Sequence, residues 1–105
     1  MAEIPHNVNI LINNYLTALK QNNIPVNQLF LFGSYAKGNY TIWSDIDLAL
    51  VSDVFEGNRI KDRSKIRPIT LSISSEIQVL PYCPDDFTVD DPFVKEIVDT
   101  GIKII

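Results

Sequence analysis

The four residues LFLF at positions 29–32 constrain the fold more than any other segment of the sequence. Four consecutive apolar residues, followed at once by Gly33, are too few for a helix and are typical of a strand that is buried on both faces. A strand of this kind requires a layer of structure on each side of its sheet. The chain has 105 residues, a length that predicts one domain over residues 1–105 with a core of its own.

Two amphipathic segments are predicted to supply helical layers. The first spans residues 5–22, where apolar residues recur at the spacing of one helical face: Val8, Leu11, Ile12, Tyr15 and Leu19. The second follows Asp90 or Asp91, either of which can cap a helix that begins at Pro92. Gly101 stands at the position that commonly follows the end of such a helix.

Three more segments are predicted as strands. Residues 45–51 alternate, so that one face of the sheet receives Ile46, Leu48 and Leu50 and the other receives Asp45, Asp47, Ala49 and Val51. Residues 53–67 fit either a helix or an ordered loop. Residues 69–80 are predicted as a third strand that ends at Pro81, and residues 102–105 as a short edge strand. This order of elements predicts an α/β (α+β) fold, a small sheet covered by helices.

Charge and cysteine content narrow the possible functions. The 9 basic and 13 acidic residues give a net charge of −4, which argues against nucleic acid as the main partner because avid binding to its backbone requires surplus Lys and Arg. No apolar run approaches the ~20 residues needed to cross a bilayer, and the N-terminus lacks a secretory signal, so the cytoplasm is the expected compartment. Cys83 is the only cysteine and His6 the only histidine. Any metal is therefore expected to be a hard cation held by carboxylates.

The turn after the first strand has the composition of an anion site. Residues 34–37 are predicted as one helical turn, whose first backbone N–H groups have no partner within the helix. Gly33 permits close approach of a ligand to the backbone, and the hydroxyl of Ser34 adds a donor, so that a phosphate could bind there. Lys37 follows Ser34 on the same helical face and could neutralise a phosphate oxygen.

Two carboxylates begin the next strand. Asp45 and Asp47 are two residues apart on a strand and project from one face, about 6–7 Å apart along the chain. Two like charges at this spacing repel one another unless a cation lies between them, and oxygen ligands of this kind suit Mg²⁺. A phosphate site beside a carboxylate pair describes a site for a metal–nucleoside triphosphate.

The sequence GSYAKG at residues 33–38, followed by SDIDL at residues 44–48, resembles the signature of the DNA polymerase beta-like nucleotidyltransferase superfamily. It is most similar to the minimal nucleotidyltransferases, short domains often encoded beside a HEPN-domain partner. The resemblance implies a nucleotidyltransferase fold with a mixed sheet. It also implies transfer of a nucleotidyl group, AMP from ATP, to a macromolecular acceptor such as a HEPN-type toxin. The chain would then act as the antitoxin.

The resemblance also assigns roles to individual residues. Gly33, Ser34, Lys37 and Ser44 would bind the nucleotide, and Asp45 and Asp47 would bind two Mg²⁺ ions. A third carboxylate on the neighbouring strand would complete the metal site and promote attack by the acceptor hydroxyl.

Two residues compete for the third carboxylate position. The nearest acid is Glu76, but the apolar residues that flank the family's acid, and the Pro-aromatic pair that follows it, match better around Gln78. The two residues share a face of the predicted strand, so that either side chain could point toward the acid pair. If Glu76 reaches the metals, the catalytic set is Asp45, Asp47 and Glu76. If Gln78 takes that place, the chain would bind Mg–nucleotide with little or no transfer and would neutralise its partner by complex formation alone.

Residues 59–67 hold five of the nine basic residues, at alternate positions. On a helix, Arg59, Arg63 and Arg67 would share one face. A solvated face is the favoured interpretation, and a patch for an RNA acceptor or an acidic partner is the alternative. The C-terminal third is acidic, and this separation of charge fits docking to a protein at least as well as binding to nucleic acid. The apolar stripe of residues 8–19 is core or an oligomer contact, so a homo-oligomer is possible.

Overall fold

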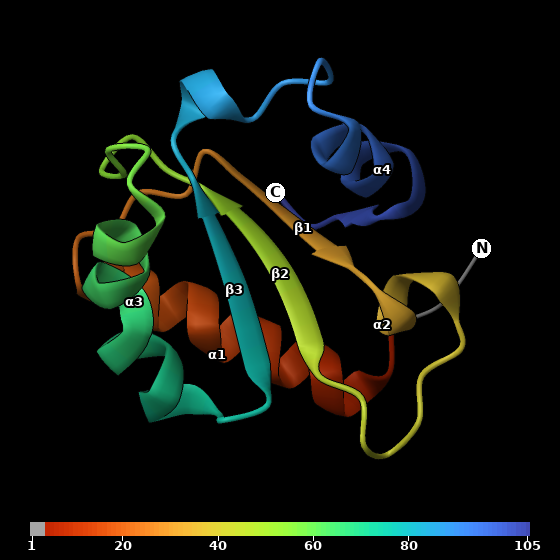
Figure 1. Cartoon of the computed structure of the whole chain (residues 1–105). Coiled ribbons are helices and arrows are strands. Elements are labelled where there is room, and N and C mark those ends of the chain that lie inside the picture. The colour runs from red at the N-terminus through yellow and green to blue at the C-terminus, as the bar shows by residue number, and fades with distance from the viewer. Residues whose placement is uncertain (1–3) are drawn as a thin grey trace.

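The computed structural model describes residues 4–105 and contains a four-stranded mixed sheet with helices on both faces (Figure 1). The strands lie in the order β3-β2-β1-β4. β1 (Gln28–Phe32) pairs antiparallel with both β2 (Ile46–Val51) and β4 (Ile102–Lys103), whereas β2 pairs parallel with β3 (Ile77–Tyr82). The α/β (α+β) fold with a small mixed sheet, expected of a nucleotidyltransferase, is therefore confirmed.

The central strands are buried on both faces, as their sequences predict. Leu29 and Leu31 of β1 lie in the core on one side of the sheet, and Phe30 lies in the core on the other side. In β2, the predicted alternation holds: Ile46, Leu48 and Leu50 join the first core, and Ala49 and Val51 join the second.

The first core lies between the sheet and two helices, α1 (His6–Gln21) and α3 (Arg59–Ile73). The buried face of α1 consists of Val8, Ile12, Tyr15 and Leu19, which are four of the five residues predicted for it. The second core lies under α4 (Pro92–Thr100), which contributes Val94 and Ile97. As predicted, α4 begins at Pro92, and the side chain of Asp91 accepts a hydrogen bond from the backbone N–H of Phe93 at 2.8 Å.

The prediction of a third strand from residue 69 is wrong at its start. Residues 69–73 are the last turns of α3, and β3 begins at Ile77. The β-branched residues Ile69 and Thr70 favour a strand locally, but Ile69 packs on the first core and Thr70 hydrogen-bonds to Tyr15 of α1 at 2.8 Å. Tertiary contacts therefore override the local preference, and the helix continues past Pro68 in its interior.

The segment 53–67, which fitted either a helix or a loop, is both. Residues 53–58 form a loop, and α3 begins at Arg59 after Asn58, whose side chain accepts a hydrogen bond from the N–H of Lys61. Asp62 lies one turn into α3 and is 1% exposed. Its carboxylate accepts hydrogen bonds from the backbone N–H groups of Glu56 at 2.9 Å and Gly57 at 3.0 Å. This residue thereby ties the loop to the helix.

Pro81 does not end β3 but lies within it. The backbone N–H of Ile46 donates to Glu76, and that of Ser52 donates to Tyr82. In a parallel ladder, every second residue faces the neighbouring strand, so the even-numbered residues of β3 face β2. Ile77, Val79 and Pro81 thus turn their backbones to the outer edge of the sheet, where the missing N–H of proline costs no ladder hydrogen bond.

The chain between β3 and α4 crosses the end of the sheet through a short 3-10 helix, η1 (Pro84–Asp86). After α4, Gly101 has an extended backbone (φ −79°). A Cβ at this position would collide with the carbonyl oxygen of Ile97 and lie 3.0 Å from that of Leu31. Glycine is required there because the chain passes close to β1 before it forms β4. Within residues 4–105, no helix has the length and apolar character to cross a membrane.

Candidate active site

The predicted acid pair and the predicted phosphate turn meet at one end of the sheet. Asp47, the second residue of β2, is the register partner of Phe32, the last residue of β1. Gly33 and the single helical turn α2 (Ser34–Lys37), which was predicted at these residues, follow directly. The antiparallel pairing of β1 with β2 therefore brings residues 33–34 beside Asp47, although about a dozen residues separate them in the sequence.

Gly33 is in contact with the side chain of Asp47. Its φ of 74° lies in the region that only glycine adopts readily, and a Cβ built on Gly33 would overlap the carboxylate of Asp47. Two independent requirements, conformation and space, therefore select glycine at this position.

Asp45 and Asp47 form a pair of like charges. Asp47 is half-buried and Asp45 is exposed. Burial, together with the negative charge of Asp45, raises the pKa of the Asp47 carboxyl above its usual value. Within residues 4–105, neither carboxylate forms an ion pair with a Lys or Arg side chain. Oxygen donors that repel one another in this way fit a hard divalent cation, whose remaining ligands would be water and phosphate oxygens.

Two other residues predicted to contact the nucleotide lie next in the chain to Gly33 and to Asp45. Ser34 is half-buried and is the first residue of α2. Ser44 is half-buried at the end of the loop that enters β2, and its hydroxyl oxygen accepts a hydrogen bond from the N–H of Thr41 at 2.8 Å. Ser44 therefore orders the loop that delivers Asp45.

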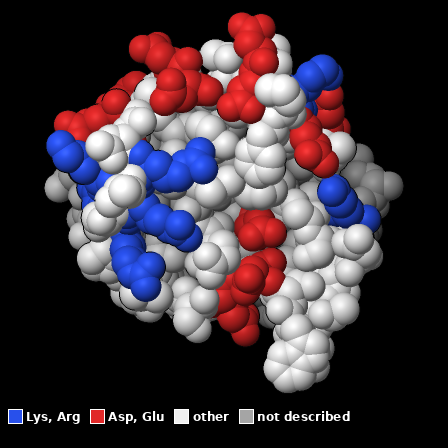
Figure 2. All heavy atoms as spheres, in the orientation of Figure 1, with Lys and Arg blue, Asp and Glu red and all other residues white. Residues whose placement is uncertain are grey.

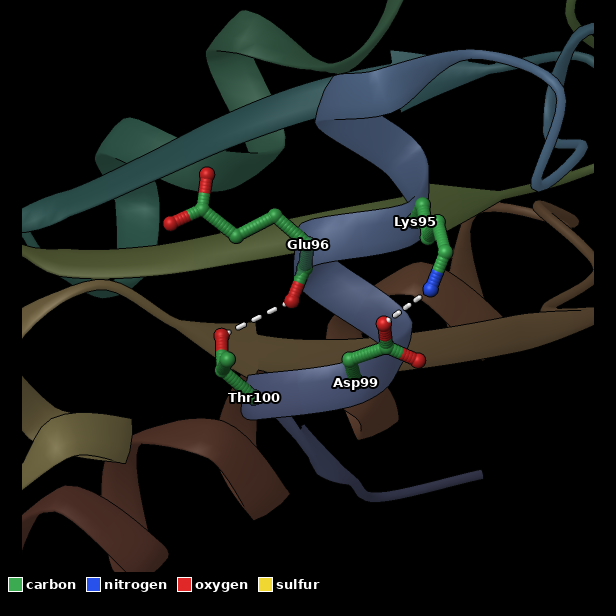
Figure 3. A network of polar contacts seen from close by, with 4 residues as sticks. All are labelled: Lys95, Glu96, Asp99 and Thr100. Atoms are coloured by element: carbon green, nitrogen blue, oxygen red, sulfur yellow. Dashed lines mark hydrogen bonds and ion pairs between the residues drawn. The ribbon is translucent and has the colours of Figure 1, made fainter.

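Lys37 points toward α4. Its Nζ lies 3.5 Å from Oε1 of Glu96, and both side chains are about half exposed. Glu96 has no role in the neighbouring Lys95–Asp99 ion pair, and in Figure 3 its carboxylate points away from that pair, while its backbone oxygen accepts from Thr100. A hollow of about 190 Å³ lies between α2 and α4 and is lined by Gly33, Lys37 and Glu96 among others.

The two candidates for the third carboxylate position lie side by side with the acid pair. Gln78 is the register partner of Asp47 in the parallel pair β2–β3, so their side chains stand on the same face of neighbouring strands. Glu76 precedes β3, and its backbone oxygen accepts from the N–H of Ile46 at 2.8 Å. Both side chains are exposed. Among residues 4–105, no three His, Cys, Asp or Glu side chains gather closely enough to hold a metal ion.

Glu76 faces two tyrosines that sequence reasoning did not single out. The rings of Tyr35 and Tyr40 stack with centroids 4.6 Å apart, and together with Glu76 they line a hollow of about 400 Å³. Burial, with smaller contributions from the charge of Glu76 and from Tyr40, raises the pKa of Tyr35. The position of Tyr35 within GSYAKG was the available signal for its nearness to the site.

The charged side chains are segregated on the surface (Figure 2). Basic side chains gather over α3, and acidic ones lie over the ends of β2 and β3 that carry the site and again over η1 and the loop after it. The basic group includes Arg59, Arg63 and Arg67, which share one face of α3 as predicted, and the guanidinium of Arg59 lies 5.9 Å from the centre of the Tyr82 ring.

The sequence matches the family described as the nucleotidyltransferase domain over residues 12–104. Among solved structures, the fold is similar to a toxin-antitoxin crystallised with AMP-PNP, with a TM-score of 0.63 and 22% identity over 89% of this chain and 71% of the other. It is also similar to a mutant of the toxin-antitoxin MntA-HpeT (TM-score 0.60, 21% identity, 90% and 71% covered). A putative nucleotidyltransferase from Sulfolobus solfataricus gives a TM-score of 0.57 at 19% identity, with 89% and 84% covered. Curated protein sequences gave no match.

The fold, with an acid pair beside a Gly-Ser turn at one end of a mixed sheet, defines a nucleotidyltransferase. The match over most of the chain shows that it belongs to the nucleotidyltransferase domain family. The resemblance to nucleotidyltransferases inferred from residues 33–48 is thereby confirmed, and the fold is the one seen in the two toxin-antitoxin structures.

Proposed function

We propose that this chain transfers AMP from ATP to a macromolecular acceptor in a Mg²⁺-dependent reaction. The single observation that carries the proposal is the contact between Gly33 and the carboxylate of Asp47, because it joins the phosphate turn to the acid pair. Asp45 and Asp47 would hold two Mg²⁺ ions. ATP is plentiful in the cytoplasm, the compartment that we propose for this activity.

The residues of the turn have distinct roles in this proposal. Gly33 lets the triphosphate approach the backbone beside Asp47, and Ser34 donates its hydroxyl to a phosphate oxygen. Lys37 neutralises phosphate charge by leaving Glu96 and pairing with a phosphate oxygen. The exchange costs little, because an ion pair that is half exposed and 3.5 Å long contributes little stability. Ser44 positions the loop before Asp45 and lies within the nucleotide-binding set.

In the transfer step, an acceptor hydroxyl oxygen forms a bond to the α-phosphorus of ATP while the bond from that phosphorus to the β-phosphate oxygen breaks. Pyrophosphate leaves, and the hydroxyl proton passes to a carboxylate beside the acid pair or to water. The Mg²⁺ supplies charge neutralisation to the triphosphate and to the attacking oxygen. Asp45 and Asp47 fix the position of the reacting groups, and Glu76 would complete the set by turning from Tyr35 toward the pair.

The acceptor in this proposal is a toxin that the chain silences by AMP transfer, with a HEPN-domain protein as the specific partner. Support comes from the fold shared with two toxin-antitoxin structures, one of which was crystallised with AMP-PNP. Within residues 4–105, the hollows beside the site measure about 190 and 400 Å³, which is small for a pocket that encloses an acceptor as well as a nucleotide. This size favours an acceptor that brings its own structure.

Calorimetric titration tests the proposal. ATP, CTP, GTP and UTP are titrated into the chain with and without Mg²⁺, and the same titrations are run on Asp45→Asn/Asp47→Asn. We expect Mg²⁺-dependent binding of ATP that disappears in this variant. A matched control, Asp85→Asn/Asp90→Asn, removes two exposed acidic charges away from the site and should bind as the natural chain does. Lack of binding by the folded natural chain contradicts the proposal.

One observation favours a second function, neutralisation of a partner by binding alone. Gln78, a neutral residue, is the register partner of Asp47 and stands where the third acid would be expected. If this position is the vacant acid site, Gln78→Glu should gain transfer activity without loss of folding, whereas Glu76→Gln should change little. If Glu76 is the third acid, Glu76→Gln abolishes transfer and Gln78→Glu adds nothing.

A further inference from the structure

A hollow of about 280 Å³ lies between α3 and β3, on the side of Gln78 away from the acid pair. Its lining includes Arg63 and Arg67 on the helix and Ile77, Gln78 and Val79 on the strand. Neighbouring strands of a sheet lie about 4.8 Å apart, and Gln78 is in register with Asp47. The hollow therefore reaches the strand that directly neighbours Asp47.

The two arginines of this hollow are available to bind an anion. Both are exposed, and within residues 4–105 neither forms an ion pair with an acidic side chain. Two other basic residues of α3 are engaged differently: Lys65 donates to the backbone oxygen of Val54 at 2.8 Å, and Arg59 lies over Tyr82. A guanidinium pair in a partly enclosed hollow is suited to a carboxylate, which it can bind through two parallel hydrogen bonds.

The strand side of the hollow offers a different kind of contact. β3 is an edge strand, and the backbone N–H and C=O groups of Ile77 and Val79 face its outer edge. Open edge groups of this kind pair with an extended peptide, and such pairing would be limited here by Pro81, which cannot donate a hydrogen bond. The free edge is therefore long enough for a short peptide segment only.

From these two observations we infer that the hollow between α3 and β3 binds an extended, acidic segment of the acceptor protein. The acidic side chain is held by Arg63 and Arg67, and the peptide backbone pairs with Ile77 and Val79. The identity of the peptide as the acceptor rests on the proposed function. The segment would lead the acceptor hydroxyl past Gln78 to the acid pair, so that the hollow determines which protein is modified.

Charge favours a peptide over a nucleic acid as the occupant. The acid pair and Glu76 lie beside the hollow, the net charge of the chain is −4, and Figure 2 shows further acidic side chains beyond the basic ones over α3. A long polyanion would have to cross these acidic surfaces, whereas one or two carboxylates on a peptide meet only the arginines.

Peptide selection tests this inference. Random dodecapeptides displayed on phage are selected on the full chain, and the dissociation constant of an enriched peptide is then measured by fluorescence polarisation. We expect enrichment of Asp and Glu and a loss of affinity of about tenfold or more in Arg63→Gln/Arg67→Gln. The control Lys61→Gln/Lys103→Gln removes two exposed positive charges that do not line the hollow and should retain the affinity. In the amide NMR spectrum, the peptide should shift Ile77 and Val79.

Three results would overturn the inference: no acidic enrichment, equal affinity in the arginine variant, or a twelve-nucleotide RNA that competes in an arginine-dependent way at lower concentration than the peptide. Two further measurements separate this inference from the proposed function. Arg63→Gln/Arg67→Gln should bind Mg–ATP as the natural chain does, and Asp45→Asn/Asp47→Asn should still bind the peptide. Loss of nucleotide binding with peptide binding intact would contradict the proposed function alone.

Discussion

The carboxylate of Asp47 occupies the space that a Cβ at position 33 would need. Gly33 has no Cβ and therefore leaves this space to the carboxylate. The two residues belong to different segments and are joined only by the antiparallel register of β1 and β2. An acid at the start of β2 and a glycine at the end of β1 are thus parts of one structural unit.

Replacement of Gly33 by alanine should therefore abolish nucleotide binding and also lower the stability of the fold. The added Cβ collides with Asp47 and is strained at a φ of 74°. We expect Gly33→Ala to lower the free energy of unfolding by about 2 kcal/mol or more. Mg²⁺-dependent ATP binding, followed by calorimetry, should be lost.

Gly38 provides a matched control. It has a φ of 80° in the left-handed helical region, so that Gly38→Ala also places a side chain at positive φ, but no contact with the acid pair is created. Gly38→Ala should lose about 1 kcal/mol of stability and keep its nucleotide affinity. Equal loss of ATP binding in both variants would contradict the role given to the contact with Asp47.

Repulsion between the carboxylates of Asp45 and Asp47 should destabilise the folded protein when no cation is bound. Because the charge of Asp45 adds to burial in disfavouring the ionised form of Asp47, Asp45→Asn should raise the thermal unfolding midpoint in buffer without divalent cations. We expect a rise of a few degrees, measured by calorimetric scanning with EDTA present. A lower midpoint would show that Asp45 has a structural role.

Alkaline pH should destabilise the protein through Tyr15. Burial raises the pKa of Tyr15 to about 12, with a smaller opposing effect of its hydrogen bond to Thr70. The neutral phenol is therefore favoured in the folded state. The resulting stability is fully present below pH 10 and is lost as the pH rises from about 10 to about 12. The loss amounts to roughly 2–3 kcal/mol.

Tyr15→Phe tests this pH dependence. The substitution removes the hydrogen bond to Thr70, whose hydroxyl still donates to the backbone oxygen of Ile66 at 3.1 Å, and should cost about 1 kcal/mol at pH 7. Urea unfolding of this variant should show a much weaker decline in stability at alkaline pH. An unchanged decline would mean that other groups cause it.

Asp62 should be the most sensitive acidic residue outside the site. Asp62→Ala removes a buried carboxylate that accepts hydrogen bonds from the partly buried backbone N–H groups of Glu56 and Gly57, and we expect a loss of about 1–3 kcal/mol in urea unfolding. Asp62→Asn retains one acceptor oxygen and should lose less. Asp53→Asn, on the exposed part of the same loop, should change stability by under about 0.5 kcal/mol.

Periodicity and capping predicted most of the fold because those signals are local. The alternation of residues 46–51, the apolar stripe of α1 and the Asp91–Pro92 start of α4 each depend on neighbours in sequence. The end of α3 could not be predicted in this way, because the hydrogen bond between Thr70 and Tyr15 joins residues 55 positions apart.

The same distinction applies to the site. The motif predicted which residues lie near the phosphate turn, but it contained no information on the partner of Lys37, because Glu96 belongs to α4 and meets Lys37 only after folding. The choice between Glu76 and Gln78 likewise depends on the register of two parallel strands. That register pairs Asp47 with Gln78, whereas spacing along the chain allowed either residue.

A crystal structure of the chain with Mg²⁺ and a non-hydrolysable ATP analogue would test the central claim most directly. We predict metal ions bound between the carboxylates of Asp45 and Asp47, with the triphosphate over Gly33 and Ser34. A triphosphate bound to Arg63 and Arg67 instead, with no metal at the acid pair, would contradict the account.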